Sequence, residues 1–492
     1  MYLLRGLTFL AVLCVGLTPS HASQTVLSMT SEGGGEGPAG SFVPLRTLDA
    51  VLETAFTTLK HPLFPNYGVR IKQSNFCEES ARAYTGYIDI EARHLFFYFF
   101  ESRSEPDKDD VIFWTNGGPG CSSEIGLLME LGPCRVVNAD NGTVPLKDSW
   151  NSKANVFFVD QPIGVGFSYA EYGEHVSTTE EAAQDIAAFV AIFFSHFSKF
   201  QGRAFHMSGE SYGGRYVPVF AAAVYDNNPR LVEAGVPPIN LTSIMIGNGM
   251  TDTAAMFPSW YKMQCSPASI PPVQSIQNCV DMKARVPRCA KWIKESCQDR
   301  FDLIDCGAAT AFCFESMLTP YVALGLNNYD ISKKCEVGSL CYPEIIEIAK
   351  FLNREDVQST LGVSPGITYT SCSEKVEIDF AWTLDIMKGA TEYVAALLER
   401  DIRVLIYVGS YDWICNWVGN EAWTLALEWS GHEEFSAQPL EDWVVDGKRA
   451  GKTRSAKGFT FATVDGAGHM VPFDKPKESL EMVKRWMAGQ PL

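Results

Sequence analysis

The sequence predicts an α/β protein with a mostly parallel central sheet and a disulfide-rich, mainly helical insertion. Six short runs are almost wholly apolar, as expected for strands buried on both faces of a parallel sheet. These runs are VIFWT, ANVFFVD, AFHMS, SIMIG, RVLIYVG and FTFATV. Stretches with apolar residues at helical spacing lie between them, and alternating strands and helices form layered α/β folds. The rhythm stops between the fourth and fifth runs, which indicates an insertion.

The domain plan follows from this pattern. Two earlier runs, at 84–90 and 94–102, are rich in aromatic and β-branched residues and are typical of strands. Residues 178–197 have the apolar spacing of a helix. The insertion carries cysteines, short helices and loops, so we expect it to cap the main domain. The expected divisions are a first core part at 67–251, a cap insertion at 252–388 and a second core part at 389–492.

The N-terminus predicts export. Residues 1–22 read as a cleaved signal peptide, with Arg5 before an apolar run and a small-x-small site ending at Ala22. A membrane anchor is the weaker interpretation, because the apolar run falls short of the ~20 residues that a span requires. Residues 23–66 are rich in Gly, Ser and Thr and predict a pro-segment or disordered leader outside the fold. No later stretch predicts a membrane span, so we expect a secretory-pathway protein of a vacuole or lysosome-like compartment, or a secreted one.

Charge and cysteine usage agree with this route. The formal charge is −18 in 492 residues, which argues against a nucleic-acid partner. Eight of the 14 cysteines lie between Cys265 and Cys341, which indicates disulfides in an exported protein. A zinc site is disfavoured because the chain has no C-x-x-C pair. Two N-x-S/T triplets predict N-glycosylation at Asn141 and Asn240.

The stretch FHMSGESYGG, at 205–214, holds Ser211 within Gly-x-Ser-x-Gly. The motif alone is weak, since a plain turn can match it by chance. Here a strand candidate precedes it and a helix candidate follows it, which is the context of the nucleophile elbow in α/β-hydrolases. The sequence therefore predicts the α/β-hydrolase fold, with Ser211 as the nucleophile.

A serine nucleophile needs a base and an acid that orients the base, in the chain order Ser, Asp, His. Asp412 follows RVLIYVG and His469 follows FTFATV, so both are expected at strand ends. His206 lies within the strand before the elbow and is expected to be structural. Asp465 and Asp474 are the competing candidates for the acid.

Backbone N–H groups must also stabilise the oxyanion of the reaction. WTNGGPGCSS, at 114–123, follows a strand and offers consecutive glycines. We expect the N–H groups of Gly118 and Tyr212 to form the oxyanion hole. A phosphate-binding loop is the alternative, but no Gly-Lys-Ser/Thr follows. No metal and no organic cofactor is expected, because HExxH and the Rossmann glycine pattern are both missing.

Four blocks together carry a resemblance: WTNGGPGCSS, GESYGGRYVP, YDWICNW and GAGHMVPFDKP. They resemble the signature blocks of the serine carboxypeptidases, and most closely those of the carboxypeptidase Y group. The resemblance runs from about residue 67 to the C-terminus and does not extend to the leader.

The resemblance implies a role for the acid that precedes the nucleophile. Asn116, Gly117, Glu130 and Glu210 match the family residues that bind the free α-carboxylate of a peptide. Two neighbouring carboxyls cannot both ionise cheaply, so one pKa rises and a proton is shared. Protonated, the pair donates hydrogen bonds to a carboxylate; ionised, it repels one.

The resemblance also implies pocket residues and disulfides. Cys415 matches a free thiol near the S1 pocket, and Met470 matches a residue that lines the leaving-group side. The implied disulfides are Cys121–Cys372, Cys265–Cys279, Cys289–Cys313, Cys297–Cys306 and Cys335–Cys341, with Cys77–Cys134 as an additional possibility.

We therefore expect a serine-type carboxypeptidase that releases C-terminal residues at acidic pH through an acyl-enzyme on Ser211. Its expected partners are peptide and protein C-termini, together with a processing protease for maturation. Two alternatives remain open at this point. One is an acyltransferase of the same fold, and the other is a protective or binding protein with incidental catalysis.

Overall fold

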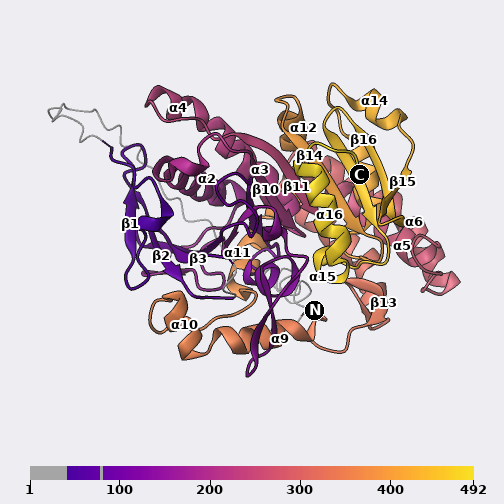
Figure 1. Ribbon diagram of the computed structural model, residues 1–492. Helices are drawn as coiled ribbons and strands as arrows, with labels where there is room; N and C mark the ends of the chain where they lie inside the picture. The colour runs from indigo at the N-terminus through magenta and orange to yellow at the C-terminus, as the bar shows by residue number, and fades with distance from the viewer. Residues whose placement is uncertain (1–41, 78–80, 339) are drawn as a thin grey trace, which may run out of the picture.

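The structure is a computed structural model that describes residues 42–77, 81–338 and 340–492. The expected signal peptide, and the leader up to residue 41, lie outside the described residues. A 13-stranded mixed sheet organises the chain (Figure 1), with β9 paired beside β4. The order of the other strands is β1-β2-β3-β4-β8-β5-β10-β11-β14-β17-β16-β15.

The six central strands, from β8 to β17, are parallel, and antiparallel strands extend both edges. The α/β fold expected from the sequence is confirmed, and each of the six apolar runs forms one central strand. The strands of the sheet are β1 Thr57–Lys60, β2 Tyr67–Ser74, β3 Ala83–Ile90, β4 Arg93–Phe100, β5 Val111–Thr115, β8 Asn155–Val159, β9 Tyr169–Ala170, β10 Phe205–Glu210, β11 Leu241–Gly247, β14 Arg403–Gly409, β15 Glu441–Val445, β16 Lys448–Ala456 and β17 Phe459–Val464. Two small hairpins pair β6 Cys134–Asn138 with β7 Gly142–Pro145, and β12 Leu326–Asn327 with β13 Asp330–Lys334.

Helices cover both faces of the sheet, because successive side chains of a buried strand point to opposite sides. In β14, Val404 and Ile406 join the core cluster of α2 and α3, whereas Leu405 and Tyr407 join the cluster of α9 and α16. The helices outside the insertion are α2 Thr179–His196, α3 Gly213–Asp226, α4 Asn228–Glu233, α12 Thr391–Leu398, α13 Trp417–Ala426, α14 His432–Ala437, α15 Val471–Asp474 and α16 Pro476–Met487. None of the helices in the described part of the chain is both long and apolar enough to cross a bilayer.

The segment between β11 and β12 forms a helical layer with its own apolar core. Tyr321 stacks on Trp413, with ring centroids 3.8 Å apart, so this layer packs onto the loop after β14. The helices between β11 and β14 are α5 Thr253–Cys265, α6 Ile276–Ile293, α7 Leu303–Cys313, α8 Thr319–Val322, α9 Pro343–Leu352, α10 Glu355–Leu361 and α11 Glu374–Trp382. Single helical turns are η1 Leu48–Ala50, η2 Gly126–Glu130, η3 Trp150–Ser152, η4 Ser198–Phe200, η5 Lys294–Gln298, η6 Phe314–Leu318 and η7 Asp385–Lys388.

Six disulfides join cysteines in the described part of the chain, and four of them lie within the insertion. They join Cys77–Cys134, Cys121–Cys372, Cys265–Cys279, Cys289–Cys313, Cys297–Cys306 and Cys335–Cys341. Cys415 is the free cysteine of the described residues, and it is buried.

The expectation that residues 23–66 lie outside the fold is wrong for 42–66. β1 pairs with β2 at the sheet edge, and Leu48 and Leu59 are each only 1% exposed. The Gly- and Ser-rich composition that suggested a leader belongs to the residues before 42. The later stretch has enough apolar side chains to pack on the sheet, and this burial favours its folded position.

We predict that Gly409→Ala destabilises the domain by about 1–3 kcal/mol through overpacking. A methyl group at the end of β14 would lie 2.7 Å from the Ala467 carbonyl oxygen and closer still to that of Gly468. The measurement is the urea unfolding midpoint.

Gly307→Ala in α7 is the matched control, because its nearest new neighbour would be Leu384 Cδ1 at 3.7 Å. We expect this helical alanine to be neutral or slightly stabilising. Equal destabilisation by both substitutions would contradict the close-approach argument.

Candidate active site

The nucleophile candidate lies at a sharp turn between β10 and α3. Ser211 has a φ of 61°, in the left-handed region that non-glycine residues rarely adopt. Its N–H donates to the Gly247 carbonyl at 3.1 Å, which fixes the turn against β11. A side chain at Gly209 would come within 2.6 Å of the Thr115 carbonyl oxygen, so this position requires glycine. The turn has the strained geometry of a nucleophile elbow.

The structure brings the expected acid and base together at the same edge of the sheet. Asp412 follows β14 and His469 follows β17, and the carboxyl ends of these parallel strands are adjacent. Asp412 Oδ2 lies 2.8 Å from His469 Nδ1, and both side chains are buried. Nδ1–H donates to the carboxylate, which leaves Nε2 as the basic nitrogen. Asp465 instead pairs with Arg449, and Asp474 accepts the Gly468 N–H.

Asn248, which the sequence did not single out, orients the acid. Its Nδ2 donates to Asp412 Oδ2 at 2.8 Å, the oxygen that also binds His469. Its Oδ1 accepts the Gly409 N–H at 3.2 Å, and its own N–H donates to the Tyr407 carbonyl at 2.8 Å. The Ile414 N–H donates to the other carboxylate oxygen, at 3.1 Å. With these donors the Asp412 carboxylate has one orientation.

Cys415 completes a cluster with the acid and the base. Ligand atoms of Asp412, Cys415 and His469 lie within 4.8 Å of one another, which is compact enough for a metal ion by distance alone. Burial, with the Asp412 charge second, raises the pKa of the Cys415 thiol well above its ordinary value. The thiol therefore stays protonated beside the Ser211 side chain, to which it hydrogen-bonds. This donor set fits an organic acid–base site better than a metal centre, because a thiol ligates metal as the thiolate.

Two backbone segments meet at the expected oxyanion hole. A side chain at Gly117 would lie 2.7 Å from the Glu210 carbonyl oxygen and closer still to the Tyr212 nitrogen. Gly118 follows with a φ of 114°, which favours glycine. The Tyr212 nitrogen precedes the first turn of α3. Backbone donors from the glycine loop and from the helix start thus lie side by side next to Ser211.

A pair of buried acids adjoins the elbow. Glu130 ends the π-helical turn η2, Glu210 ends β10, and the two carboxyls hydrogen-bond to each other. Asn116 Nδ2 donates to Glu130 Oε1 at 3.2 Å and to Glu210 Oε1 at 3.0 Å. The Asn116 oxygen accepts the Trp114 indole N–H and the Gly126 N–H, at 2.8 and 3.0 Å, which defines the amide orientation.

These contacts raise the pKa of both acids. Burial raises the pKa of Glu130 to about 7, and the hydrogen bonds from Glu210 and Asn116 limit the rise. Burial and the charge of Glu130 raise the pKa of Glu210 well above its ordinary value. At least one of the two groups is therefore neutral at mildly acidic pH, and they titrate as a pair.

The insertion reaches over the site. The Tyr329 carbonyl accepts the His469 N–H at 2.8 Å, and the rings of these two residues lie 5.0 Å apart. Tyr329 lies in the β12–β13 connection, so this hairpin covers the base. Met470, next along the chain, is 3% exposed. The sequence carried no signal for Tyr329.

A second buried contact joins the insertion to the elbow. Tyr212 Oη donates to Asp385 Oδ2 at 2.8 Å, and the Thr179 N–H donates to Asp385 Oδ1 at 3.1 Å. Arg215 lies 3.5 Å from the same carboxylate. Asp385 is fully buried, so it holds the start of α2, the start of α3 and η7 in one position.

An α/β-hydrolase fold with a serine elbow, an Asp–His hydrogen bond and paired backbone donors defines a serine hydrolase. The serine carboxypeptidase family model matches residues 74–489. The chain therefore belongs to the serine carboxypeptidase family. It is a serine-type carboxypeptidase, an enzyme that acts on peptides.

Individual relatives agree with this assignment. Carboxypeptidase Y of Komagataella phaffii is 40% identical over 430 residues, which cover 86% of this chain and 80% of the relative. Carboxypeptidase Y of Candida albicans is 41% identical over 431 residues, covering 86% and 77%. Among solved structures, the prohormone-processing carboxypeptidase KEX1(delta)p of Saccharomyces cerevisiae matches with a TM-score of 0.71 and 25% identity, covering 86% of this chain and 92% of that one.

We predict that Asn248→Ala lowers kcat for ester substrates by about tenfold while KM changes little. The substitution removes one hydrogen bond to the Asp412 carboxylate, and a bond to a charged group contributes about 1.5–3 kcal/mol. The measurement is steady-state kinetics with a blocked amino-acid ester.

Asn353→Ala is the control, because the Asn353 side chain also donates and accepts hydrogen bonds, but its partners include the Tyr369 backbone and no triad residue. If both variants lost activity equally, general destabilisation would explain the effect and Asn248 would have no positioning role.

Proposed function

We propose that this serine carboxypeptidase releases C-terminal amino acids at acidic pH through an acyl-enzyme on Ser211. His469 takes the proton of Ser211 as the hydroxyl attacks the last peptide carbonyl, and Asp412 stabilises the imidazolium that forms. The N–H groups of Gly118 and Tyr212 stabilise the oxyanion. His469 then donates its proton to the departing amino acid, and water hydrolyses the acyl-enzyme.

The observation that carries the exopeptidase function is the buried acid pair beside the elbow. The pair keeps at least one neutral carboxyl at acidic pH, and Asn116 donates to both Glu130 and Glu210. In this state the pair, with Asn116 and the Gly117 backbone, offers hydrogen-bond donors to a free carboxylate. A peptide with a free C-terminal carboxylate binds these donors. An internal peptide bond has no carboxylate that could accept from them.

The sign of the pH dependence follows from the pair. The pKa of Glu130 is raised to about 7, so this acid is neutral below that pH and becomes charged above it. Ionisation of Glu130 places a negative charge next to the substrate carboxylate. Binding of peptides therefore weakens as pH rises, and activity is highest below about pH 6.

Two neighbouring pockets belong to the same proposal. Cys415 lies beside Ser211 and Asp412, where it borders the S1 side, and Met470 borders the leaving-group side. Both side chains are almost fully buried. The acyltransferase alternative uses the same triad but needs no recognition of a free carboxylate, and the intact acid pair favours the carboxypeptidase. The protective or binding alternative needs no such triad.

The same proposal covers the compartment and maturation. Six disulfides suit the oxidising secretory pathway, and an acid pair of this kind suits a vacuole or lysosome-like compartment. Asn141 and Asn240 are both exposed, as N-glycosylation requires. A processing protease would remove the leader.

For a blocked dipeptide with a free carboxylate, we predict that kcat/KM falls above about pH 7, by up to about tenfold per pH unit, mainly through KM. The double substitution Glu130→Gln and Glu210→Gln leaves no titrating group in the pair. It should remove this alkaline limb and raise KM at about pH 5. The measurement is kcat and KM from about pH 4 to 8.

Glu124→Gln is the matched control, because Glu124 is also a buried, proton-sharing acid, coupled to Asp160 outside the site. It should keep the alkaline limb. The carboxylate-recognition proposal would be contradicted if the alkaline limb survived in the double variant. Equal cleavage of the dipeptide and its amide at acidic pH would contradict it as well.

We predict that a fluorophosphonate probe labels the wild-type enzyme and that Ser211→Ala abolishes labelling. Ser208→Ala, three residues earlier in β10, should leave labelling intact because Ser208 is not at the elbow. Labelling in the Ser211→Ala variant would assign the nucleophile elsewhere. A catalytically silent protein that is still labelled would favour the protective or binding alternative.

A further inference from the structure

The first six described residues, 42–47, run across the end of α2 and the end of β1, and we call them the N-terminal latch. Phe42 lies between two histidine rings, with centroids 4.5 Å from His61 and 5.0 Å from His196. Both histidines are nearly fully buried. The catalytic machinery uses neither of them.

His196 holds the latch by a bond that only the neutral ring can make. Its Nδ1 accepts the Leu45 N–H at 3.3 Å, and its Nε2–H donates to the Lys60 carbonyl at 2.9 Å. The Arg46 N–H adds a bond of 2.7 Å to the His196 carbonyl. A second proton on the ring would place N–H against N–H at Leu45, so protonation breaks this contact.

His61 contacts the latch through the Phe42 ring, and its acceptor bond is to a residue outside the latch. Its Nδ1 accepts the Leu63 N–H at 3.2 Å, and its buried Nε2 has no hydrogen-bond partner among the described residues. Two charges act on this ring, Arg230 from α4 and His196 from α2, and both oppose its protonation. At His196 the Lys60 carbonyl favours the proton, but burial outweighs it. The charged residue within the latch is Arg46, which is basic as well.

We propose that residues 42–47 form an acid-released latch, which presents this stretch to a processing protease only in an acidic compartment. The direction follows from the neutral state that the His196 ring requires when the latch is docked, and from the burial of the His61 ring against Phe42. Burial lowers the pKa of both histidines below their ordinary value of 6.5. The docked state therefore binds fewer protons than the released state, and it loses stability as pH falls below about 6.5. Two histidines shift the equilibrium by up to about a hundredfold per pH unit.

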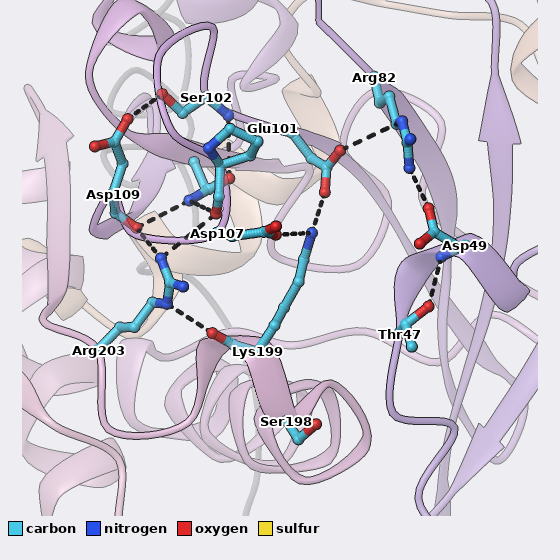
Figure 2. A network of polar contacts seen from close by, with 12 residues as sticks. Thr47, Asp49, Arg82, Glu101, Ser102, Asp107, Asp109, Ser198, Lys199 and Arg203 are labelled. Carbon is cyan, nitrogen blue, oxygen red and sulfur yellow. Dashed lines mark hydrogen bonds and ion pairs between the residues drawn. The ribbon is translucent and has the colours of Figure 1, made fainter.

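A network of ion pairs limits the release to the latch. Figure 2 shows Asp49 beside Arg82, Arg82 beside Glu101, and Glu101 paired with Lys199. Arg82 holds the pKa of Asp49 below its ordinary value, so this pair stays charged at the pH that protonates histidine. Leu48 and Val51 are buried beneath it. The chain from residue 48 onward therefore stays docked when residues 42–47 detach.

The docked latch cannot serve as a protease substrate, because a protease binds several residues in an extended, detached form. Release supplies such a segment at the junction between the leader and the folded domain. This consequence rests on the proposed maturation by a processing protease. The latch itself does not, because its pH dependence comes from the two histidines and not from cleavage.

Hydrogen exchange of the full-length protein tests the latch directly. Exchange of the peptide that covers residues 42–47 is compared at about pH 5 and about pH 7.5, after correction for the intrinsic rate. We expect about a tenfold or larger loss of protection in acid for the wild type. The double substitution His61→Gln and His196→Gln supplies an amide oxygen to accept the Leu45 N–H and cannot take up a proton. It should keep the peptide protected at both pH values.

His206→Gln is the matched control, because His206 is a buried histidine bonded to Ser243 and Asp110 in the core. It should behave like the wild type in the latch peptide. The proposal is overturned if the wild-type latch is equally protected at both pH values, or if the double glutamine variant opens in acid as the wild type does.

Digestion with papain, which cleaves at both pH values, tests the consequence for processing. We expect acid-enhanced cleavage within or next to residues 42–47 in the wild type and not in the double glutamine variant. An acid-opened latch without enhanced cleavage would overturn its role in processing. Hydrolysis of a blocked dipeptide, measured on the same samples, shows separately whether the proposed enzymatic function fails.

Discussion

The burial of Glu130 and Glu210 side by side is the constraint on which the proposed substrate-binding side of this molecule depends. Both carboxyls are at most 3% exposed, and two buried negative charges this close would be strongly destabilising. One proton and the Asn116 amide remove most of that penalty. The folded active site therefore needs at least one neutral acid. A neutral acid can also donate a hydrogen bond to the carboxylate at a chain end. The stability of the fold and the proposed recognition of a carboxylate therefore both require a neutral carboxyl in this pair.

Close backbone approach places this pair next to the chemistry. The loop at Gly117 lies against the Tyr212 nitrogen and the Glu210 carbonyl, at a distance that excludes any side chain. A shift of this loop would move the oxyanion donors, the acid pair and the nucleophile relative to one another. Outside this contact, Asn248 hydrogen-bonds to Asp412, and the Tyr329 carbonyl accepts the His469 N–H. Because these two contacts come from β11 and from the insertion, the cap is part of the catalytic geometry.

The sequence predicted the fold and the elbow well because their signals are local. Apolar runs, glycine spacing and chain order need only neighbouring residues, and the six central strands lie where those runs occur. Tyr329 and Asp385 escaped prediction because their roles depend on contacts across more than a hundred residues, which no local pattern records. Asn248 could have been predicted, because a polar residue at the end of an apolar strand is a recognisable signal. The stretch 42–66 was misjudged because the glycine-rich segment before it dominated the composition.

Helix α2 links the elbow to the proposed latch. At its first turn Thr179 binds Asp385, which binds Tyr212 beside the nucleophile; at its last turn His196 holds residues 42–47. The two ends of this 18-residue helix are about 25 Å apart. A carboxyl pair becomes neutral when it gains a proton, which preserves its hydrogen bonds, whereas a buried imidazole becomes charged and loses its acceptor. The same fall in pH thus favours both the neutral acid of the proposed binding site and the proposed release of the N-terminus.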